Sequence, residues 1–304
     1  MKARAQVAEW RRLPERGSPL VARTLAWTSL RLGRGATLPV MRVMAAYYFL
    51  FAPAARRHMR AYLRRALGRE PSAAERYRLI LCFATTILDR LFLLAGHHAA
   101  YEISLEGEAL IRDVAGSGGA LLFGAHMGSF EVLRTLADRQ PGLKVAMAMY
   151  EENARKVNAV MATAAPRDPP EIIALGHVDA MLRIRERLDA GALVGVLADR
   201  TLGAEPSMPV NFLGATAQLP LGPMRAAALL QRRVLFMLGL YRGGCRYHIV
   251  FEPLADFRHV SRAGRAEAVE CAIVRYAQLL ERYCRSDPYN WFNFFDFWAQ
   301  PACA

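Results

Sequence analysis

The sequence predicts an α/β protein with a central, mostly parallel sheet flanked by helices, preceded by an N-terminal region that is helical, basic and amphipathic. Three observations predict this class. From Tyr101 onward, apolar strand patterns alternate with helical patterns, which is typical of parallel sheets. The first hundred residues show helical periodicity. The basic charge is concentrated at the start: residues 1–70 hold 15 Lys and Arg against 3 acids, whereas the remaining 234 residues hold 25 and 24.

Two helices are predicted between residues 56 and 95. The segment 56–67 has an apolar stripe on one side and arginines on the other, and Gly68 ends it. Ser72 and Glu75 have the spacing of a capping box, which predicts the start of a long apolar helix over 75–95. Helices that combine arginine with apolar and aromatic residues in this way lie on membrane surfaces.

Residues 1–100 are therefore expected to form a membrane-associating region. The longest early run without charge, 43–55, has 13 residues, whereas a helix needs roughly 18–20 to span a bilayer. We interpret it as an interfacial or shallowly inserted helix, whose basic flanks suit an anionic cytoplasmic leaflet. A nucleic-acid binder would spread its basic charge over the working domain, so no nucleic-acid partner is expected.

Residues 101–304 are expected to form the α/β domain. Strand patterns cover 101–105, 120–125, 144–150, 171–175, 192–198, 234–241 and 246–251. Helical patterns cover 108–115, 129–139, 153–164, 177–190, 222–231 and 265–285. The five cysteines are scattered and form no CxxC pair, which indicates a reducing compartment.

One segment, GALLFGAHMGSFEVLR, places titratable side chains at a strand end. His126 follows the strand, Gly128 permits a tight turn, Ser129 is placed to cap the next helix, and Glu131 falls in its first turn. Reactive groups gather at the carboxyl ends of strands in open α/β sheets. A histidine accepts a proton near neutral pH, and a carboxylate on its other ring nitrogen fixes the tautomer. The spacing thus suggests a catalytic pair, although a satisfied polar histidine and a glutamate at a helix dipole are ordinary alternatives.

Asp199 and Arg200 follow a second apolar strand. A guanidinium there is suited to a phosphate, and the alternative is a structural ion pair between the two neighbours or with the edge of the core. The stretch 212–223 has turn residues at both ends and an apolar middle, so it either lines an acyl groove or forms an ordinary core loop and helix start. Its polar candidates are Thr216 and Gln218.

The tail 289–298 holds seven aromatic residues in ten positions. We expect it to dock on the core, with a lid over an acyl chain or an aromatic belt at a membrane interface as alternatives. The pair His97-His98 lacks a partner with metal-ligand spacing, so no metal site is expected. A G-x-S-x-G elbow is also missing, which favours direct attack by the substrate's own hydroxyl over a covalent acyl-enzyme.

The stretch HMGSFE resembles the H-x4-D/E motif of the lysophospholipid acyltransferase superfamily, with His126 and Glu131 in the motif positions. GAHMGSFEVLR, LADRTLG, the PVNFLG…LPLGP region and the tail PYNWFNFFDFW resemble, in the same order, its lipid A (lauroyl-type) acyltransferase branch. They are most similar to the predicted members linked to aryl-polyene and flexirubin-like pigment lipids. The resemblance covers about 101–298.

This resemblance implies an α/β acyltransferase fold, no metal or resident cofactor, and an acyl-carrier-protein or CoA thioester as donor. In the resembled family the block at Asp199-Arg200 lies where an acceptor or donor headgroup is held. The glycerolipid branch carries Glu-Gly-Thr at this block, and this chain does not. A glycerol-phosphate acceptor is therefore not expected.

From these patterns we expect an acyltransferase that acts on a hydroxyl or amine of a membrane lipid or glycolipid, at the cytoplasmic face of the inner membrane. His126 would be the general base, and Glu131 would orient it. Backbone amides over 128–130 would stabilise the oxyanion. The expected substrate-binding residues are Arg200, Asp199, Gly128, Ser129, Thr216 and Gln218. The alternative is a non-catalytic lipid-binding scaffold of a lipid-synthesis complex that retains the fold.

Overall fold

The computed structural model describes residues 19–115, 118–133, 135, 143–150, 171–177, 179–201 and 205–299, with the backbone alone for 19–23 and 115. The helices are α2 (Pro19–Phe51), α3 (Pro53–Leu67), α4 (Ala73–Leu94), α5 (Glu108–Ala115), α8 (Ala180–Asp189), α9 (Gly222–Leu230) and α10 (Arg265–Ser286), with 3-10 turns η1 (His98–Ala100) and η2 (Glu131–Leu133). The strands are β1 (Glu102–Glu106), β2 (Ala120–Gly124), β3 (Val145–Tyr150), β4 (Glu171–Leu175), β5 (Leu193–Leu197), β6 (Ser207–Phe212), β7 (Ala215–Pro220), β8 (Arg233–Tyr241) and β9 (Arg246–Asp256).

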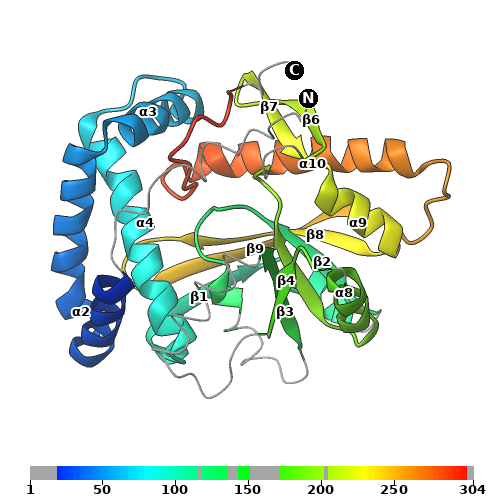
Figure 1. Cartoon of the computed structure of the whole chain (residues 1–304), viewed down its shortest axis with the longest axis horizontal. Helices are drawn as coiled ribbons and strands as arrows, with labels where there is room; N and C mark the ends of the chain where they lie inside the picture. Colours follow the sequence, from blue (N-terminus) through cyan, green and yellow to red (C-terminus); the bar gives the residue numbers. More distant parts are fainter. Residues whose placement is uncertain are drawn as a thin grey trace, which may run out of the picture.

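Seven strands form one sheet in the order β1-β9-β8-β2-β5-β3-β4, and β6 pairs with β7 in a separate hairpin (Figure 1). Every neighbouring pair in the large sheet is parallel except β8 and β9. Helices α2, α3 and α4 stack at one end of the sheet, and α8 and α9 lie toward the other. The expected mixed α/β architecture with a mostly parallel sheet is confirmed.

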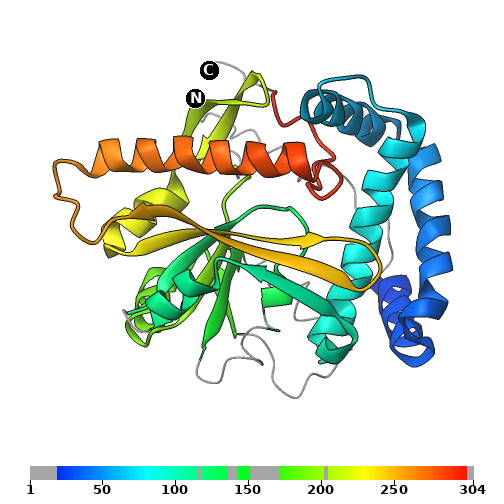
Figure 2. The same cartoon turned by 180° about the vertical axis from the view of Figure 1, so that it is seen from behind.

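Both faces of the sheet are covered. On β2, Leu121 and Phe123 belong to the core cluster that α3, α9 and α10 share, whereas Ala120 and Leu122 belong to the cluster that α5 and the C-terminal half of α4 share. Figure 2 shows α10 lying along one face from end to end. Because β2 is buried on both sides, its sequence is a continuous apolar run rather than an alternating one.

The strands expected from the sequence agree with β1–β5, β8 and β9 to within a residue at their starts, and β9 continues to Asp256. One prediction was half wrong: a helix does start in the stretch 212–223, since α9 begins at Gly222, but the residues before it form most of a β-hairpin rather than a loop. Leu213 and Gly214 form its turn, both with positive φ (51° and 75°). Such turns favour Asn-Gly, and a leucine in this place hides the signal.

The helix expected over 129–139 begins as the 3-10 turn η2, and 134 and 136–142 lie outside the described residues. The helix expected over 153–164 lies outside them entirely. The capping box at Ser72 is confirmed, since its side chain accepts from the Glu75 amide and the Glu75 carboxylate accepts from the Ser72 amide.

The uncharged run 43–55 divides between α2 and α3, which bend by 96° around Ala52. Among the described helices, none alone is long and apolar enough to cross a membrane; α2 from Thr24 and α3 reach that length and composition only as this bent pair. A second break lies inside α2 at Gly33 (φ 84°). The outer side of α2 exposes Trp27, Leu32, Val40, Val43, Met44, Tyr47, Leu50 and Phe51.

A buried carboxylate fastens these helices to the sheet. Asp89 of α4 is fully buried and accepts from Arg34 of α2, with Nε to Oδ1 at 2.5 Å. Tyr101, just before β1, and Tyr247 of β9 donate their hydroxyls to it at 3.0 and 2.9 Å. Arg34 also donates to the Gly244 carbonyl in the β8–β9 turn. The N-terminal helices therefore share a polar core contact with the sheet.

Candidate active site

The register of two parallel strands brings His126 and Asp199 together. In the pairing of β2 with β5, Gly124 lies opposite Leu197. His126 and Asp199 each follow by two residues, so both sit at the carboxyl end of the sheet. Nδ1 of His126 lies 2.7 Å from Oδ1 of Asp199.

The Asp199 carboxylate is 1% exposed and has three donors. Besides the imidazole on Oδ1, the His126 amide and the Trp291 indole N–H both donate to Oδ2 at 3.1 Å. Burial alone would raise the pKa of Asp199, but His126, Arg200 and the indole bond outweigh it and hold this pKa well below its usual range. An ionised Asp199 accepts a hydrogen bond from Nδ1–H, and this bonding assigns the lone pair of His126 to Nε2.

His126 is positioned to act as a base. Its side chain is 30% exposed, and among the residues that the structure describes none hydrogen-bonds Nε2. Burial lowers the pKa of His126 from its ordinary value, and the positive charges of Arg200 and Arg90 add to this, against the opposite effect of Asp199. The imidazole is therefore neutral at neutral pH and able to accept a proton.

The structure does not place Glu131 on the imidazole, as the sequence led us to expect. Its Oε1 lies 2.6 Å from Nε of Arg90 on α4, and its Oε2 accepts from the Ser129 hydroxyl at 2.9 Å. The chain after His126 turns through Gly128 (φ 69°) into the short η2 turn rather than directly into an α-helix. The carboxylate is thus held by α4, and Asp199 takes the orienting position expected for Glu131.

The turn at Gly128 is packed tightly against β8. Its amide donates to the Asn290 carbonyl at 2.9 Å, and the Ser129 amide donates to the Gly239 carbonyl at 2.8 Å. A Cβ on Gly128 would stand 1.9 Å from that Gly239 oxygen. These two amides are therefore already used, and an oxyanion at this point would have to displace their bonds. For Gly128 and Ser129, the expectation of an oxyanion hole over 128–130 does not fit this geometry.

Arg200 brings a positive charge to the site without an ion pair of its own in the described part of the chain. Its Nη2 donates to the Phe292 carbonyl at 2.8 Å, and its guanidinium lies 5.2 Å from the Phe295 ring centroid. Burial lowers the pKa of Arg200, with Asp199 acting against it. Both Asp199 oxygens are bonded to His126 and Trp291. Asp199 and Arg200 therefore do not form a simple ion pair with each other.

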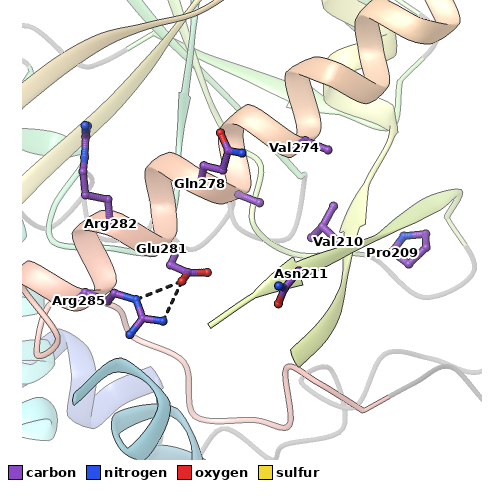
Figure 3. Close-up of a pocket in the computed structure, with 9 residues that line it drawn as sticks. Pro209, Val210, Asn211, Val274, Gln278, Glu281, Arg282 and Arg285 are labelled. Atoms are coloured by element: carbon purple, nitrogen blue, oxygen red, sulfur yellow. Dashed lines mark hydrogen bonds and ion pairs between the residues drawn. The ribbon is translucent and has the colours of Figure 1, made fainter. Parts of the chain in front are cut away.

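Thr216 and Gln218 lie on β7, away from the imidazole contacts described so far. Gln218 accepts from the Ser207 hydroxyl across the hairpin at 3.1 Å. A groove of about 620 Å³ runs between β6 and α10 (Figure 3). Neither Thr216, Gln218 nor His126 lines it. A substrate role for these two polar residues stays a prediction.

The sequence model of one protein family, described as bacterial lipid A biosynthesis acyltransferase, matches residues 16–300. The chain belongs to this family. It is therefore an acyltransferase, and the alternative of a non-catalytic scaffold is set aside. The match includes the N-terminal helices as well as the sheet. No individual curated protein matches the chain.

Sequence reasoning missed three residues of this candidate site, and two of them, Arg90 and Trp291, carry no local signal that would have predicted their contacts. Arg90 is one arginine among many in the N-terminal helices. Trp291 lies in an aromatic tail that is expected to dock on the core. The sequence does not predict the hydrogen-bond partner of its indole. Asn290 gives a partial signal, because a buried amide among aromatic residues needs partners; it bonds both the N–H and the C=O of Tyr241.

Proposed function

We propose that this acyltransferase moves an acyl group from an acyl-carrier-protein or CoA thioester to a hydroxyl or amine of a membrane lipid or glycolipid. His126 is the general base, and Asp199 orients it. The observation that carries the proposal is the 2.7 Å contact between Nδ1 and the buried carboxylate, which leaves Nε2 of a 30% exposed side chain without a hydrogen bond among the described residues.

The reaction follows from this geometry. Nε2 takes the proton of the acceptor hydroxyl or amine as its oxygen or nitrogen attacks the thioester carbonyl carbon. The resulting imidazolium is stabilised by the ionised Asp199. When the tetrahedral intermediate collapses, the carbon–sulfur bond breaks and the imidazolium returns its proton to the leaving thiolate. One proton is moved in each direction, and no group of the protein is acylated.

The cations around the imidazole are proposed to hold the anionic parts of the substrates. Arg200 is half-buried beside His126, and its guanidinium bonds only a carbonyl among the described contacts. A buried guanidinium binds a phosphate in a bidentate manner and loses little hydration in doing so. Arg90 is different, because Glu131 already balances its charge. We propose that Arg90 and Glu131 act together to hold the turn that carries His126.

The outer face of α2 is proposed to contact the cytoplasmic surface of the inner membrane. This face exposes Val43 and Tyr47 at 70% and 58%, and arginines flank it. Apolar side chains enter the interface while arginines meet lipid phosphates. Val43→Glu is expected to weaken sedimentation with anionic vesicles. Leu229→Glu on α9 changes a residue of similar exposure (65%) and should leave it intact. Equal binding by both variants would contradict the proposal.

The catalytic proposal is tested with His126→Ala, assayed in purified enzyme with acyl-carrier-protein and CoA donors. Loss of a general base lowers kcat by about 10²- to 10⁴-fold. His248→Ala is the matched control, because His248 also contacts a carboxylate, Glu106, but at the edge of the sheet. Undiminished turnover in His126→Ala would refute the mechanism.

The four sequence stretches that resemble the branch linked to aryl-polyene and flexirubin-like lipids predict that the transferred acyl group is a polyene. Mass spectrometry of the lipids that disappear when this chain is deleted would identify that group. Loss of a saturated fatty acyl lipid, with no polyene, would contradict the branch and leave the acyltransferase assignment intact.

A further inference from the structure

The C-terminal tail forms one wall of the His126 site. After α10 the chain returns across the ends of β2 and β8, and Trp291 forms an antiparallel bridge with Met127. The Phe292 amide donates to the His126 carbonyl at 2.8 Å, while the Gly128 amide donates to the Asn290 carbonyl. The tail is therefore hydrogen-bonded to the segment on both sides of Met127.

From this wall, the Trp291 indole reaches the carboxylate behind the imidazole. Its N–H donates to Oδ2 of Asp199 at 3.1 Å, and both side chains are 1% exposed. Oδ1 of the same carboxylate faces His126. The indole and the imidazole ring thus bind opposite oxygens of one buried carboxylate, and the His126 amide shares Oδ2 with the indole. The indole is the one side-chain donor on Oδ2 among the described contacts, so it helps to fix the plane of the carboxylate that holds the imidazole.

The indole itself is held in place. Its ring is packed edge-on against Tyr62 of α3 and against Phe297, both with centroids at 4.8 Å, and against Phe212 at 5.4 Å. Tyr62 is fixed in turn by a hydrogen bond from its hydroxyl to the Pro288 carbonyl at 2.8 Å. Rotation of the indole away from Asp199 would break this packing, so its N–H remains directed at the carboxylate.

We propose that Trp291 is a positioning residue for acyl transfer: its indole N–H holds the Asp199 carboxylate in the orientation that presents Nε2 of His126 to the acceptor. This inference rests on the proposed function of His126. Trp291 does not contact substrate in this scheme. Its effect is on the rate of the chemical step and not on substrate affinity, because it acts only through the base.

The test is Trp291→Phe, which keeps an aromatic ring and removes the N–H donor. We expect kcat to fall about 10- to 100-fold through loss of one hydrogen bond to a charged group, with the KM for donor and acceptor changed by less than about twofold. Trp298→Phe is the matched control. Its indole belongs to the same tail and aromatic cluster, but donates to the Phe212 carbonyl at 3.1 Å. A kcat for Trp291→Phe equal to that of Trp298→Phe would overturn the proposal.

A second measurement covers the case in which Trp291→Phe does not fold. The chain has four tryptophans, so ¹⁵N-indole spectra of the full-length protein contain four N–H signals, assigned by replacing the other three. Asp199→Asn should move the Trp291 signal most, because it replaces an anionic acceptor with a neutral one. An unmoved Trp291 signal would overturn the proposal. If His126→Ala retains full turnover, the proposed function fails instead; if it is inactive while Trp291→Phe is not, only this inference fails.

Discussion

Two buried aspartates sit in different regions of the molecule and are used differently. Asp89, in the N-terminal helices, accepts from the Arg34 guanidinium and two tyrosine hydroxyls. Asp199, at the carboxyl end of the sheet, accepts from the His126 ring, the His126 amide and an indole. Both carboxylates are almost completely buried, and each is bonded by three groups.

The difference lies in what the partners do with a proton. Arg34 stays protonated, since Asp89 raises its pKa further against the effect of burial. Its contact with Asp89 is therefore a permanent ion pair. Burial lowers the pKa of His126, so the imidazole is neutral at neutral pH and its Nε2 lone pair is able to accept a proton. A buried carboxylate thus fastens helices in one region, and in the other it holds the imidazole that we propose as the general base. Partner identity, not burial, separates the structural carboxylate from the one that we propose to support catalysis.

The largest effects are expected when each aspartate is replaced by the neutral asparagine. Asp199→Asn should lower kcat by about 10³- to 10⁴-fold, because the amide no longer fixes the productive tautomer. Its unfolding free energy should change much less than that of Asp89→Asn. Asp89→Asn should cost about 3 kcal/mol of stability, since it leaves Arg34 without its counter-charge, while the folded fraction keeps its kcat. Kinetics and denaturant unfolding of both variants measure this, and similar profiles would remove the distinction.

The glycine turns of the two regions also differ, in how tightly each is packed. Gly128 and Gly68 both have φ of 69°, but a Cβ on Gly128 would meet the Gly239 carbonyl, whereas one on Gly68 meets nothing within 4 Å. Gly68→Ala should therefore cost about 1 kcal/mol, from the backbone conformation alone. Gly128→Ala should cost at least about 3 kcal/mol, because packing strain is added. Equal melting temperatures would show that the turn has room to move.

Arg90 links the two regions, because it extends from α4 to Glu131 beside the active site. If the two act as one unit, Arg90→Gln and Glu131→Gln should each lower kcat/KM about tenfold, and the double variant should be no worse than the more impaired single variant. A double-mutant cycle measures the coupling. Additive losses would mean that Glu131 has a role that does not pass through Arg90.

The smallest expected effect is a displacement of the pH profile. Arg200 lowers the pKa of His126, which must be neutral to act as a base. Arg200→Gln should therefore raise that pKa and move the acidic limb of kcat/KM to higher pH, by up to about one pH unit. The rate at pH 8, relative to the plateau, should be unaffected. A limb that moves to lower pH would contradict the charge effect.

Sequence patterns located most of the secondary structure because those signals are local. The long apolar helix α4 was predicted from its capping box, and β2 from its apolar run. The hairpin of β6 and β7 was not predicted, because its turn uses Leu213-Gly214 in place of a favoured pair. The break between α2 and α3 at Ala52 was not predicted either, since the uncharged run 43–55 continues across it.

The sequence by itself determined that His126 and Asp199 each stand just beyond a buried strand. Only the tertiary structure decided that they meet. The strand order puts β2 beside β5, although 73 residues separate His126 from Asp199, and Trp291 arrives from 92 residues further on. Glu131 is only five residues from His126, but the turn at Gly128 and the cation on α4 direct it elsewhere. Nearness along the chain predicts contact inside a helix, whereas contacts at the ends of a parallel sheet depend on strand order and register.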